Sequence, residues 1–307
     1  MFLGVDGGGT KTAYCLIDAD GAVVAEARTA SIYYLMSDIG IVAPLLTDGV
    51  GQVCATAGIE PADITHAFFG IPCYGEVSKD VPVLDEIPRK ILGTGRYACG
   101  NDMICGWAGS LGGRDGINVV AGTGSIAYGE HGDRAIRTGG WGELFGDEGS
   151  GYWTAVQGLN AFSRMSDGRL PRGPLVDVLR RVMGLDDDLD AVDVVLNRWQ
   201  GDRARIAALS TAVSEAAAAG DTVCASILAG AGRELAALVD AAAGALAFPA
   251  GEPVPVSYSG GMFTSELLLA AFRDALGDRF DLRVPLLPPD RGAAVYAARL
   301  AGHRIPL

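Results

Sequence analysis

The chain has 307 residues, of which 49% are hydrophobic, and carries a formal net charge of −13. This length and apolar content are sufficient for a large core divided over about two domains. The negative charge argues against a nucleic-acid-binding surface, which requires clustered Lys and Arg, and its simplest role is solubility.

The cysteine pattern and the sequence ends indicate the cellular setting. None of the six cysteines belongs to a C-x-x-C motif or to a Cys/His cluster with zinc spacing. No basic and apolar leader opens the sequence, and no uninterrupted apolar run reaches transmembrane length. We therefore expect a cytoplasmic protein with free thiols and no membrane contact.

The first part of the chain is predicted to alternate strands and helices. Strands are expected at 2–5, 13–17, 64–71 and 96–101, and helices at 39–57 and 102–111. The segment between them that contains Pro72, Gly75, Pro82 and Pro88 is expected to be a loop. The polar, glycine-rich segment 112–116 is placed at the main domain boundary.

The second part repeats this alternation with more helix. Strands are expected at 117–120, 126–129, 253–260 and 281–286. Helices are expected at 149–166, 174–183, 190–199, 202–219, 221–247, 264–276 and 291–302. This order of elements predicts an α/β protein with two layered domains.

Two glycine-rich turns are the most informative local features. "GVDGGGTKTAYCLI" and "VVAGTGSIAYG" each place glycines and a threonine between two strands, and neither has Rossmann or P-loop spacing. Glycines allow backbone N–H groups to approach phosphate oxygens without a Cβ in the way. Together with a strand followed by Gly260-Gly261, the turns predict one nucleotide held between two domains.

Six segments in one order carry a resemblance to a known family. They are "GVDGGGTKTAYCLIDADG", "NDMICGWAGS", "VVAGTGSIAYG", "GGWGELFGDEGSGYW", "VSYSGGMF" and "GAAVYAARLAG". On these the chain resembles the N-acetylglucosamine kinases of the actin/hexokinase superfamily, which are grouped with the BadF/BadG-type ATPases. The resemblance implies two ribonuclease H-like (actin-like ATPase) domains, 1–116 with the C-terminal helix 290–307 and 117–289 with helical insertions. It also implies a nucleotide and sugar cleft between them.

The resemblance implies ATP and Mg²⁺ as cofactors. Asp6 would help to hold Mg²⁺ through water, the alternative being an Asx-turn residue. The positions that would contact the nucleotide are Gly8, Gly9, Thr10, Lys11, Thr12, Gly122, Thr123, Gly124, Ser214, Gly260, Gly261 and Thr264. For Ser214 and Thr264 an ordinary place on a helix is an equal alternative.

The resemblance also assigns the sugar side of the site. Asp102 would be the catalytic base that accepts the proton of the sugar hydroxyl; alternatively it caps the helix that follows. The other positions implied to line the sugar pocket are Tyr33, Ser125, Gly140, Trp141, Gly142 and Asp147. For Asp147 the competing role is capping of the next helix together with Ser150.

One departure from the family concerns the substrate. Tyr33 occupies the position where the family's N-acetylglucosamine kinases usually have Asn, and its neighbours Ile32 and Tyr34 do not restore the amide. A phenol is bulkier than an amide and forms fewer hydrogen bonds. Either the sugar differs, or Tyr33 reaches the same hydroxyl by another route.

The predicted activity is ATP-dependent phosphorylation of an amino sugar, N-acetylglucosamine or glucosamine, at the 6-hydroxyl. The alternative is an ATP-dependent activator of BadF type with an iron–sulfur cluster, which would need suitably placed cysteines in each chain. The expected partners are ATP and a small sugar, without nucleic acid. The sequence does not determine which sugar is bound or which hydroxyl is phosphorylated. It also leaves the oligomeric state open, a homodimer being one possibility.

Overall fold

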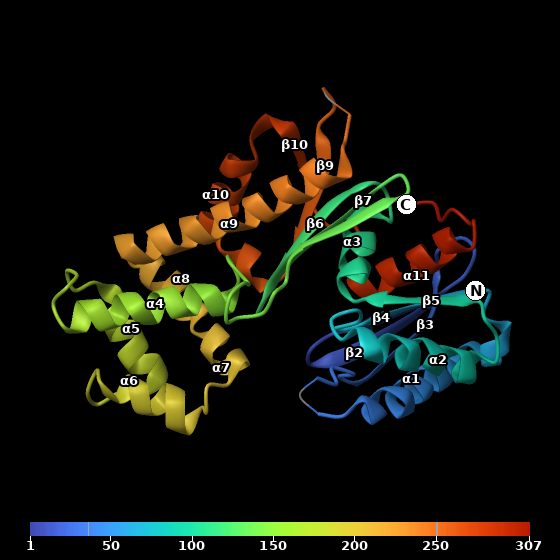
Figure 1. Ribbon diagram of the computed structural model, residues 1–307, viewed down its shortest axis with the longest axis horizontal. Coiled ribbons are helices and arrows are strands. Elements are labelled where there is room, and N and C mark those ends of the chain that lie inside the picture. The colour runs from blue at the N-terminus through green and yellow to red at the C-terminus, as the bar shows by residue number, and fades with distance from the viewer. Residues whose placement is uncertain (36, 250) are drawn as a thin grey trace. The chain divides into compact units, whose positions relative to one another are not determined.

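The computed structural model describes residues 1–35, 37–249 and 251–307, which fold into two compact units (Figure 1). The first unit contains Met1–Asn118 and Val284–Leu307, and the second contains Val119–Arg283. Each unit is organised around a five-stranded mixed sheet with helices packed on it. This is the α/β architecture that the order of elements predicts.

The sheet of the first unit has the strand order β3-β2-β1-β4-β5. β1 is antiparallel to β2 and parallel to β4, and β4 is parallel to β5. The strands are β1 (Phe2–Gly7), β2 (Lys11–Ile17), β3 (Val23–Ala30), β4 (His66–Ile71) and β5 (Tyr97–Asn101). The helices of this unit are α1 (Val42–Ala57), α2 (Val81–Leu92), α3 (Met103–Leu111) and α11 (Pro289–Leu300).

Helices cover both faces of this sheet (Figure 1). Because side chains alternate along a strand, Leu3 packs in a cluster with Leu46 of α1, whereas Phe2 packs in a second cluster with Ala294 of α11. A Cβ atom at Gly4 would lie 2.2 Å from the Ala294 backbone nitrogen, so a glycine is required where α11 crosses β1. The end of the chain thus returns to complete the first unit.

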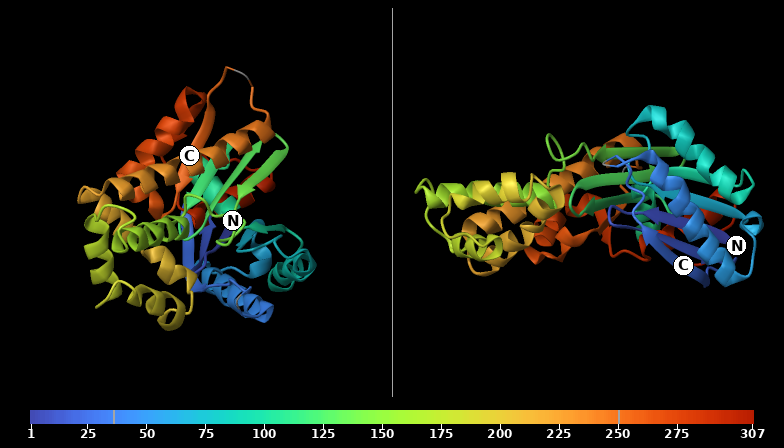
Figure 2. Two further views of the ribbon diagram at one scale, coloured as in Figure 1. Left: turned by 60° about the vertical axis from the view of Figure 1, so that its left-hand side comes forward. Right: turned by 90° about the horizontal axis from the view of Figure 1, so that it is seen from below.

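The second unit has the strand order β10-β9-β6-β7-β8. Its strands are β6 (Gly116–Ala121), β7 (Ser125–His131), β8 (Arg134–Gly139), β9 (Val254–Ser259) and β10 (Phe280–Arg283). The long helix α9 (Thr222–Leu246) packs on β7 and β8, and α10 (Glu266–Leu276) packs on α9 (Figure 2). The remaining helices are α4 (Gly151–Ser166), α5 (Pro174–Met183), α6 (Asp190–Asp193), α7 (Arg203–Ala208) and α8 (Ser210–Ala218).

The two sheets share one topology. In each, the first strand of the unit lies at the centre, its hairpin partners lie on one side, and the last two strands lie on the other. The glycine-rich turns occupy the same place in both, between the first and second strands. The similarity of these two sequence segments therefore reflects a repeat of the fold.

Three elements were not expected from the sequence, and the first is strand β3, which pairs antiparallel with β2. Helix α2 replaces the predicted loop: it has proline at its start, where a missing N–H costs nothing, and it also tolerates Pro88 inside. Strand β8 is a partly exposed edge strand with a polar sequence, so it lacks the apolar alternation by which strands are recognised.

Two segments, Ile39–Ala57 and Thr222–Leu246, are long and apolar enough to cross a membrane when judged by length and composition. Neither is an uninterrupted apolar run, and in the second Arg233, Glu234 and Asp240 interrupt the apolar residues. In the structure each presents one face to the core, with Leu46 and Val50 buried in the first and Leu228 and Leu235 in the second. We describe both as core helices.

Candidate functional site

The carboxyl ends of β1, β4 and β5 meet at one edge of the first sheet, as parallel strands require. The register pairs Asp6 with Gly70 of β4, and Gly70 with Gly100 of β5. Asp102 follows directly after β5, one residue beyond Asn101. Two of the predicted functional carboxylates are therefore brought to the same edge by strand register.

Gly70 allows helix α3 to begin close to the sheet. A Cβ atom at Gly70 would lie 2.2 Å from the Cys105 sulfur and 3.2 Å from the Asp102 Cα atom. Any larger residue at this position would displace the first turn of the helix, and Asp102 with it. The glycine thereby holds Asp102 next to the end of β1.

Asp102 does not cap α3 with its side chain. The bond is made instead by the preceding residue, because the Asn101 Oδ1 atom accepts a hydrogen bond from the Met103 N–H at 3.1 Å. The half-buried Asp102 carboxylate therefore has no capping role in this helix. This removes the main structural alternative to its assignment as the base.

The charge environment of this edge is strongly acidic. Burial, followed by the negative charges of Asp102 and Asp290, raises the pKa of Asp6 from 3.8 to about 7. A nearby thiol, Cys105, and the cation of Lys11 act in the opposite direction. Asp290 stands at the start of α11 and was not among the predicted site residues, because no motif marks it. The negative charge gathered at this edge favours a nearby cation or proton.

The glycine turn between β1 and β2 lies beside these carboxylates. It is closed by a hydrogen bond of 2.9 Å from the Gly8 N–H to the Lys11 carbonyl oxygen, and Gly9, Thr10 and Lys11 are exposed. Thr12 differs from the expectation: its side chain is fully buried and its hydroxyl donates to the Ala30 carbonyl oxygen at 3.0 Å. The structure therefore does not support a phosphate contact by the Thr12 hydroxyl.

Tyr33 is tied to the same turn. The Ser31 hydroxyl donates to the Gly8 carbonyl oxygen at 2.8 Å and accepts from the Tyr33 N–H at 3.0 Å. Burial, followed by the charge of Glu76, raises the pKa of Cys73 to about 12; Asp102 also raises it, and a hydrogen bond with Tyr33 lowers it. Tyr33, Cys73 and Asp102 thus belong to one neighbourhood of the first unit.

In the second unit, the turn Gly122–Ser125 rests on the start of helix α4. The carbonyl oxygens of Gly122 and Thr123 accept hydrogen bonds from the N–H groups of Gly151 and Tyr152 at 2.8 and 3.2 Å. Ser150 caps the helix, its hydroxyl accepting from the Trp153 N–H at 3.1 Å. The positive end of the α4 dipole therefore points toward the turn, which favours anions there.

Asp147 connects this turn to helix α7. The side chain is 3% exposed and its Oδ1 atom accepts from the Ser125 N–H at 3.4 Å, while Oδ2 pairs with Arg203. Ser125 is held further by a bond from its hydroxyl to the Glu148 carbonyl oxygen at 2.7 Å. Asp147 is thus a buried support of the turn, and its predicted sugar contact remains a prediction that requires the carboxylate to be uncovered.

The adenosine motif packs on the same turn. Gly260 lies against the backbone of Ala121, the last residue of β6, and Gly261 and Thr264 are exposed beside it. The Thr264 hydroxyl donates to the Gly261 carbonyl oxygen at 2.7 Å. Ser214 lies half-buried on α8, and its predicted nucleotide contact stays a prediction.

The segment Gly140–Gly142 is the exposed part of the predicted sugar wall. Gly140 and Gly142 have φ angles of 70° and 85°, which glycine adopts readily. Trp141 is 71% exposed, and Leu144 and Phe145 follow with 87% and 75%. An apolar surface of this kind is available for a ligand face.

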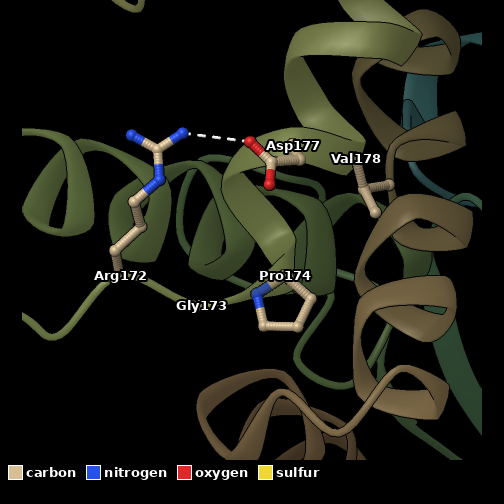
Figure 3. Close-up of a pocket in the computed structure, with 5 residues that line it drawn as sticks. All are labelled: Arg172, Gly173, Pro174, Asp177 and Val178. Atoms are coloured by element: carbon tan, nitrogen blue, oxygen red, sulfur yellow. Dashed lines mark hydrogen bonds and ion pairs between the residues drawn. The ribbon is translucent and has the colours of Figure 1, made fainter.

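Neither the pocket at the start of α5 nor any cluster of metal-ligand side chains among the described residues adds to this site. A pocket at the start of α5 is lined by Arg172, Gly173, Pro174, Asp177 and Val178, none of them a predicted site residue (Figure 3). In the described part of the chain, no group of three or more His, Cys, Asp or Glu side chains is arranged to hold a metal ion. Mg²⁺ usually keeps several waters and binds only one or two carboxylates, so Asp6 and its neighbours fit that mode.

The chain is similar in sequence and in fold to proteins named as N-acetylglucosamine kinases. The chain is 28% identical to the N-acetylmuramic acid/N-acetylglucosamine kinase of Clostridium acetobutylicum over 76% of each chain. It is also 28% identical to the N-acetyl-D-glucosamine kinase of Dictyostelium discoideum over 85% of each chain. A solved structure from Chromobacterium violaceum, of a candidate N-acetylglucosamine kinase, superimposes with a TM-score of 0.74 at 27% identity, covering 96% of this chain and 98% of that one.

The likeness to the Chromobacterium violaceum structure shows that this fold is the two-domain fold expected from the resemblance. The family model described as the BadF/BadG/BcrA/BcrD ATPase family matches residues 3–297, which is nearly the whole chain. The chain therefore belongs to the BadF/BadG/BcrA/BcrD ATPase family.

Proposed function

We propose that this protein is an ATP-dependent kinase that phosphorylates an amino sugar, N-acetylglucosamine or glucosamine, at its 6-hydroxyl. The observation that carries the proposal is the position of Asp102 at the carboxyl edge of the first sheet, beside Asp6 and near Tyr33. Its side chain forms no capping bond to helix α3. Relatives named as kinases of N-acetylglucosamine support the same activity.

The two glycine turns are proposed to bind the phosphates of ATP. The Gly8 and Gly122 N–H groups close their own turns, so the N–H groups proposed to face the phosphates are those of 9–11 in the first unit and 123–124 in the second. Thr10 and Thr123 are exposed on these turns. Helix α4 adds the field of its positive end at the second turn. Gly260, Gly261 and Thr264 are proposed for the adenosine part, because they lie next to the start of that turn.

Asp6 is proposed to hold Mg²⁺ through water molecules. When bound, the ion would neutralise charge on the phosphate oxygens and so favour phosphoryl transfer. The raised pKa of Asp6 means that the carboxyl has a strong preference for a nearby cation or proton.

Asp102 is proposed to accept the proton of the sugar 6-hydroxyl. As this proton is lost, the sugar oxygen bonds to the γ-phosphorus of ATP, the bond from that phosphorus to its bridging oxygen breaks, and ADP leaves. Tyr33 and Trp141 are proposed to contact the sugar, together with Asp147 once its carboxylate is uncovered. The enzyme is proposed to be cytoplasmic.

The activator alternative receives less support. Among the described residues all six cysteines are free, and five are buried, which leaves Cys99 as the half-buried one. A cluster shared by two chains needs thiolates that reach the surface together. Protein purified without oxygen should therefore show no iron–sulfur absorbance.

The test is an ADP-release assay over a sugar panel, with identification of the product. N-acetylglucosamine, glucosamine, N-acetylmannosamine, N-acetylmuramic acid and glucose are each incubated with ATP and Mg²⁺. We expect turnover with at least one of the first two, and a 6-phosphate product by NMR. ADP release that no sugar stimulates would overturn the proposal.

A further inference from the structure

Arg203 is an unassigned cation next to the second glycine turn. It begins α7, and its guanidinium forms ion pairs with two acidic residues of the segment that precedes α4. The Nη2 atom pairs with Asp147, and the Nε atom lies 3.1 Å from the Glu143 Oε2 atom. The side chain is 38% exposed, whereas that of Asp147 is 3% exposed.

The pair lies against the turn itself. A Cβ atom at Gly124 would be 2.6 Å from Arg203 Nη2 and 2.8 Å from Asp147 Oδ2. The other oxygen of the same carboxylate accepts from the Ser125 N–H. Position 124 must therefore be glycine for the ion pair to reach the turn. The guanidinium lies against Gly124, the residue that follows Thr123 in the turn.

The ion pair between Arg203 and Asp147 changes the charge that an anion would meet at the second glycine turn. Without Arg203, Asp147 would be a buried and uncompensated carboxylate directly under the turn, with Glu143 close by. A negative charge there would repel phosphate oxygens and offset the favourable field of the α4 dipole. With Arg203 in place, the Asp147 carboxylate can position the Ser125 backbone while its charge is compensated, so an anion on the turn meets less repulsion.

We propose that Arg203 is a positioning residue of the ATP site, which holds Asp147 beneath the Gly122–Ser125 turn and neutralises its charge so that the turn accepts the triphosphate. This inference rests on the proposed function, because it takes the turn as a phosphate site. A purely structural role for Arg203, as a clamp that fastens α7, makes a different prediction. A clamp would affect folding stability without distinguishing nucleotides by their phosphates.

The test compares the binding of ATP and AMP in the absence of any sugar, by competition with a fluorescent ATP analogue. We expect Arg203→Met to raise the Kd for ATP at least tenfold and that for AMP less than threefold. Arg203→Lys should recover most of the loss, and so should the double variant Arg203→Met with Asp147→Asn, which removes both charges. Arg205→Met is the matched control, since Arg205 is exposed on the same helix.

Equal losses for ATP and AMP, or no recovery in the double variant, would overturn the inference. If Arg203→Met does not fold, Asp147→Asn alone decides the matter. This near-isosteric change removes one negative charge from beneath the turn while Arg203 keeps its ion pair with Glu143, so it should lower the Kd for ATP, whereas a tenfold rise would contradict a neutralising role. Because no sugar is present, failure here is distinguishable from failure of the sugar panel.

Discussion

Gly260 lies directly against Ala121: a Cβ atom at Gly260 would be 2.3 Å from the Ala121 carbonyl oxygen and 2.5 Å from its carbon. Gly260 also has a φ angle of 101°, which L-residues rarely adopt. At Gly261, the next residue, no atom lies within 4 Å of the Cβ position. The end of β9 therefore touches β6 just before the second glycine turn, and only one of two adjacent glycines is sterically required.

The two glycines should respond differently to alanine. Gly260→Ala should lower the free energy of unfolding by about 3 kcal/mol, because the backbone clash and the strained φ angle act together. Gly261→Ala should change it by less than about 0.5 kcal/mol. Urea unfolding of both variants measures the difference, and equal effects would contradict the packing described here.

Gly261→Ala also tests the nucleotide site. If adenine and ribose lie on this exposed glycine, the added methyl group should weaken ATP binding about tenfold, since one misplaced contact is worth 1–2 kcal/mol in a packed site. The measurement is the Kd for ATP of a variant whose stability is unchanged. Unaltered binding would place the adenosine elsewhere on the second unit.

Replacement of Asp102 separates catalysis from stability. Asp102→Asn should lower kcat by roughly 10²–10⁴, which is the usual contribution of a positioned general base. Its Tm should stay close to that of the wild type, because the Asp102 side chain forms no capping bond to α3. The ADP-release assay and thermal unfolding measure the two quantities.

The neighbouring residue provides the comparison. Asn101→Ala removes the side chain that accepts from the Met103 N–H, so it should cost about 1 kcal/mol of stability, as the loss of a helix cap does. A variant Asp102→Asn that is as destabilised as Asn101→Ala, yet keeps most of its turnover, would return Asp102 to a structural role.

The sequence predicted most of the fold because its apolar segments and glycines follow local rules. Helix α1 ends at Gly58 in the left-handed conformation, as a C-terminal glycine indicates. Helix α2 was not predicted, because two prolines outweighed its apolar spacing. For the candidate site, motif order predicted Asp6 and Asp102, and strand register brings both to one edge of the first sheet. Only tertiary contacts bring Arg203, Asp290 and Cys73 to the candidate sites, and no local sequence motif predicts them.

The acidic edge predicts a pH-dependent stability. In the metal-free protein Asp6 has a pKa of about 7, against 3.8 when unfolded, so the folded state binds more protons between these values. Stability should therefore fall as the pH rises from about 4 to 7, by at most about 4 kcal/mol, and then level off. Urea unfolding in EDTA at several pH values measures the slope.

Asp6→Asn is the control for this slope. The amide cannot ionise, so the variant should gain stability relative to the wild type as the pH rises from about 4 to 7, and the two should converge near pH 4. A difference between them that does not depend on pH would show that Asp6 is already ionised in the folded protein. The same comparison with Mg²⁺ present should show a smaller slope for the wild type, because a bound cation favours the carboxylate.

Tyr33→Asn tests the sugar side. Tyr33 is anchored through Ser31 to the glycine turn and is bonded to Cys73 near Asp102, so its side chain belongs to the neighbourhood of the proposed base. An amide is smaller than a phenol and can both donate and accept hydrogen bonds, which suits an N-acetyl sugar. The ratio of kcat/KM for N-acetylglucosamine to that for glucosamine should change at least tenfold, the size expected when a pocket gains or loses a polar partner.

Tyr33→Phe keeps the ring and loses the hydroxyl; it should change this ratio less than Tyr33→Asn does. Identical ratios in all three proteins would place the sugar away from Tyr33, because a residue that touches the substrate cannot change shape and polarity without altering selectivity.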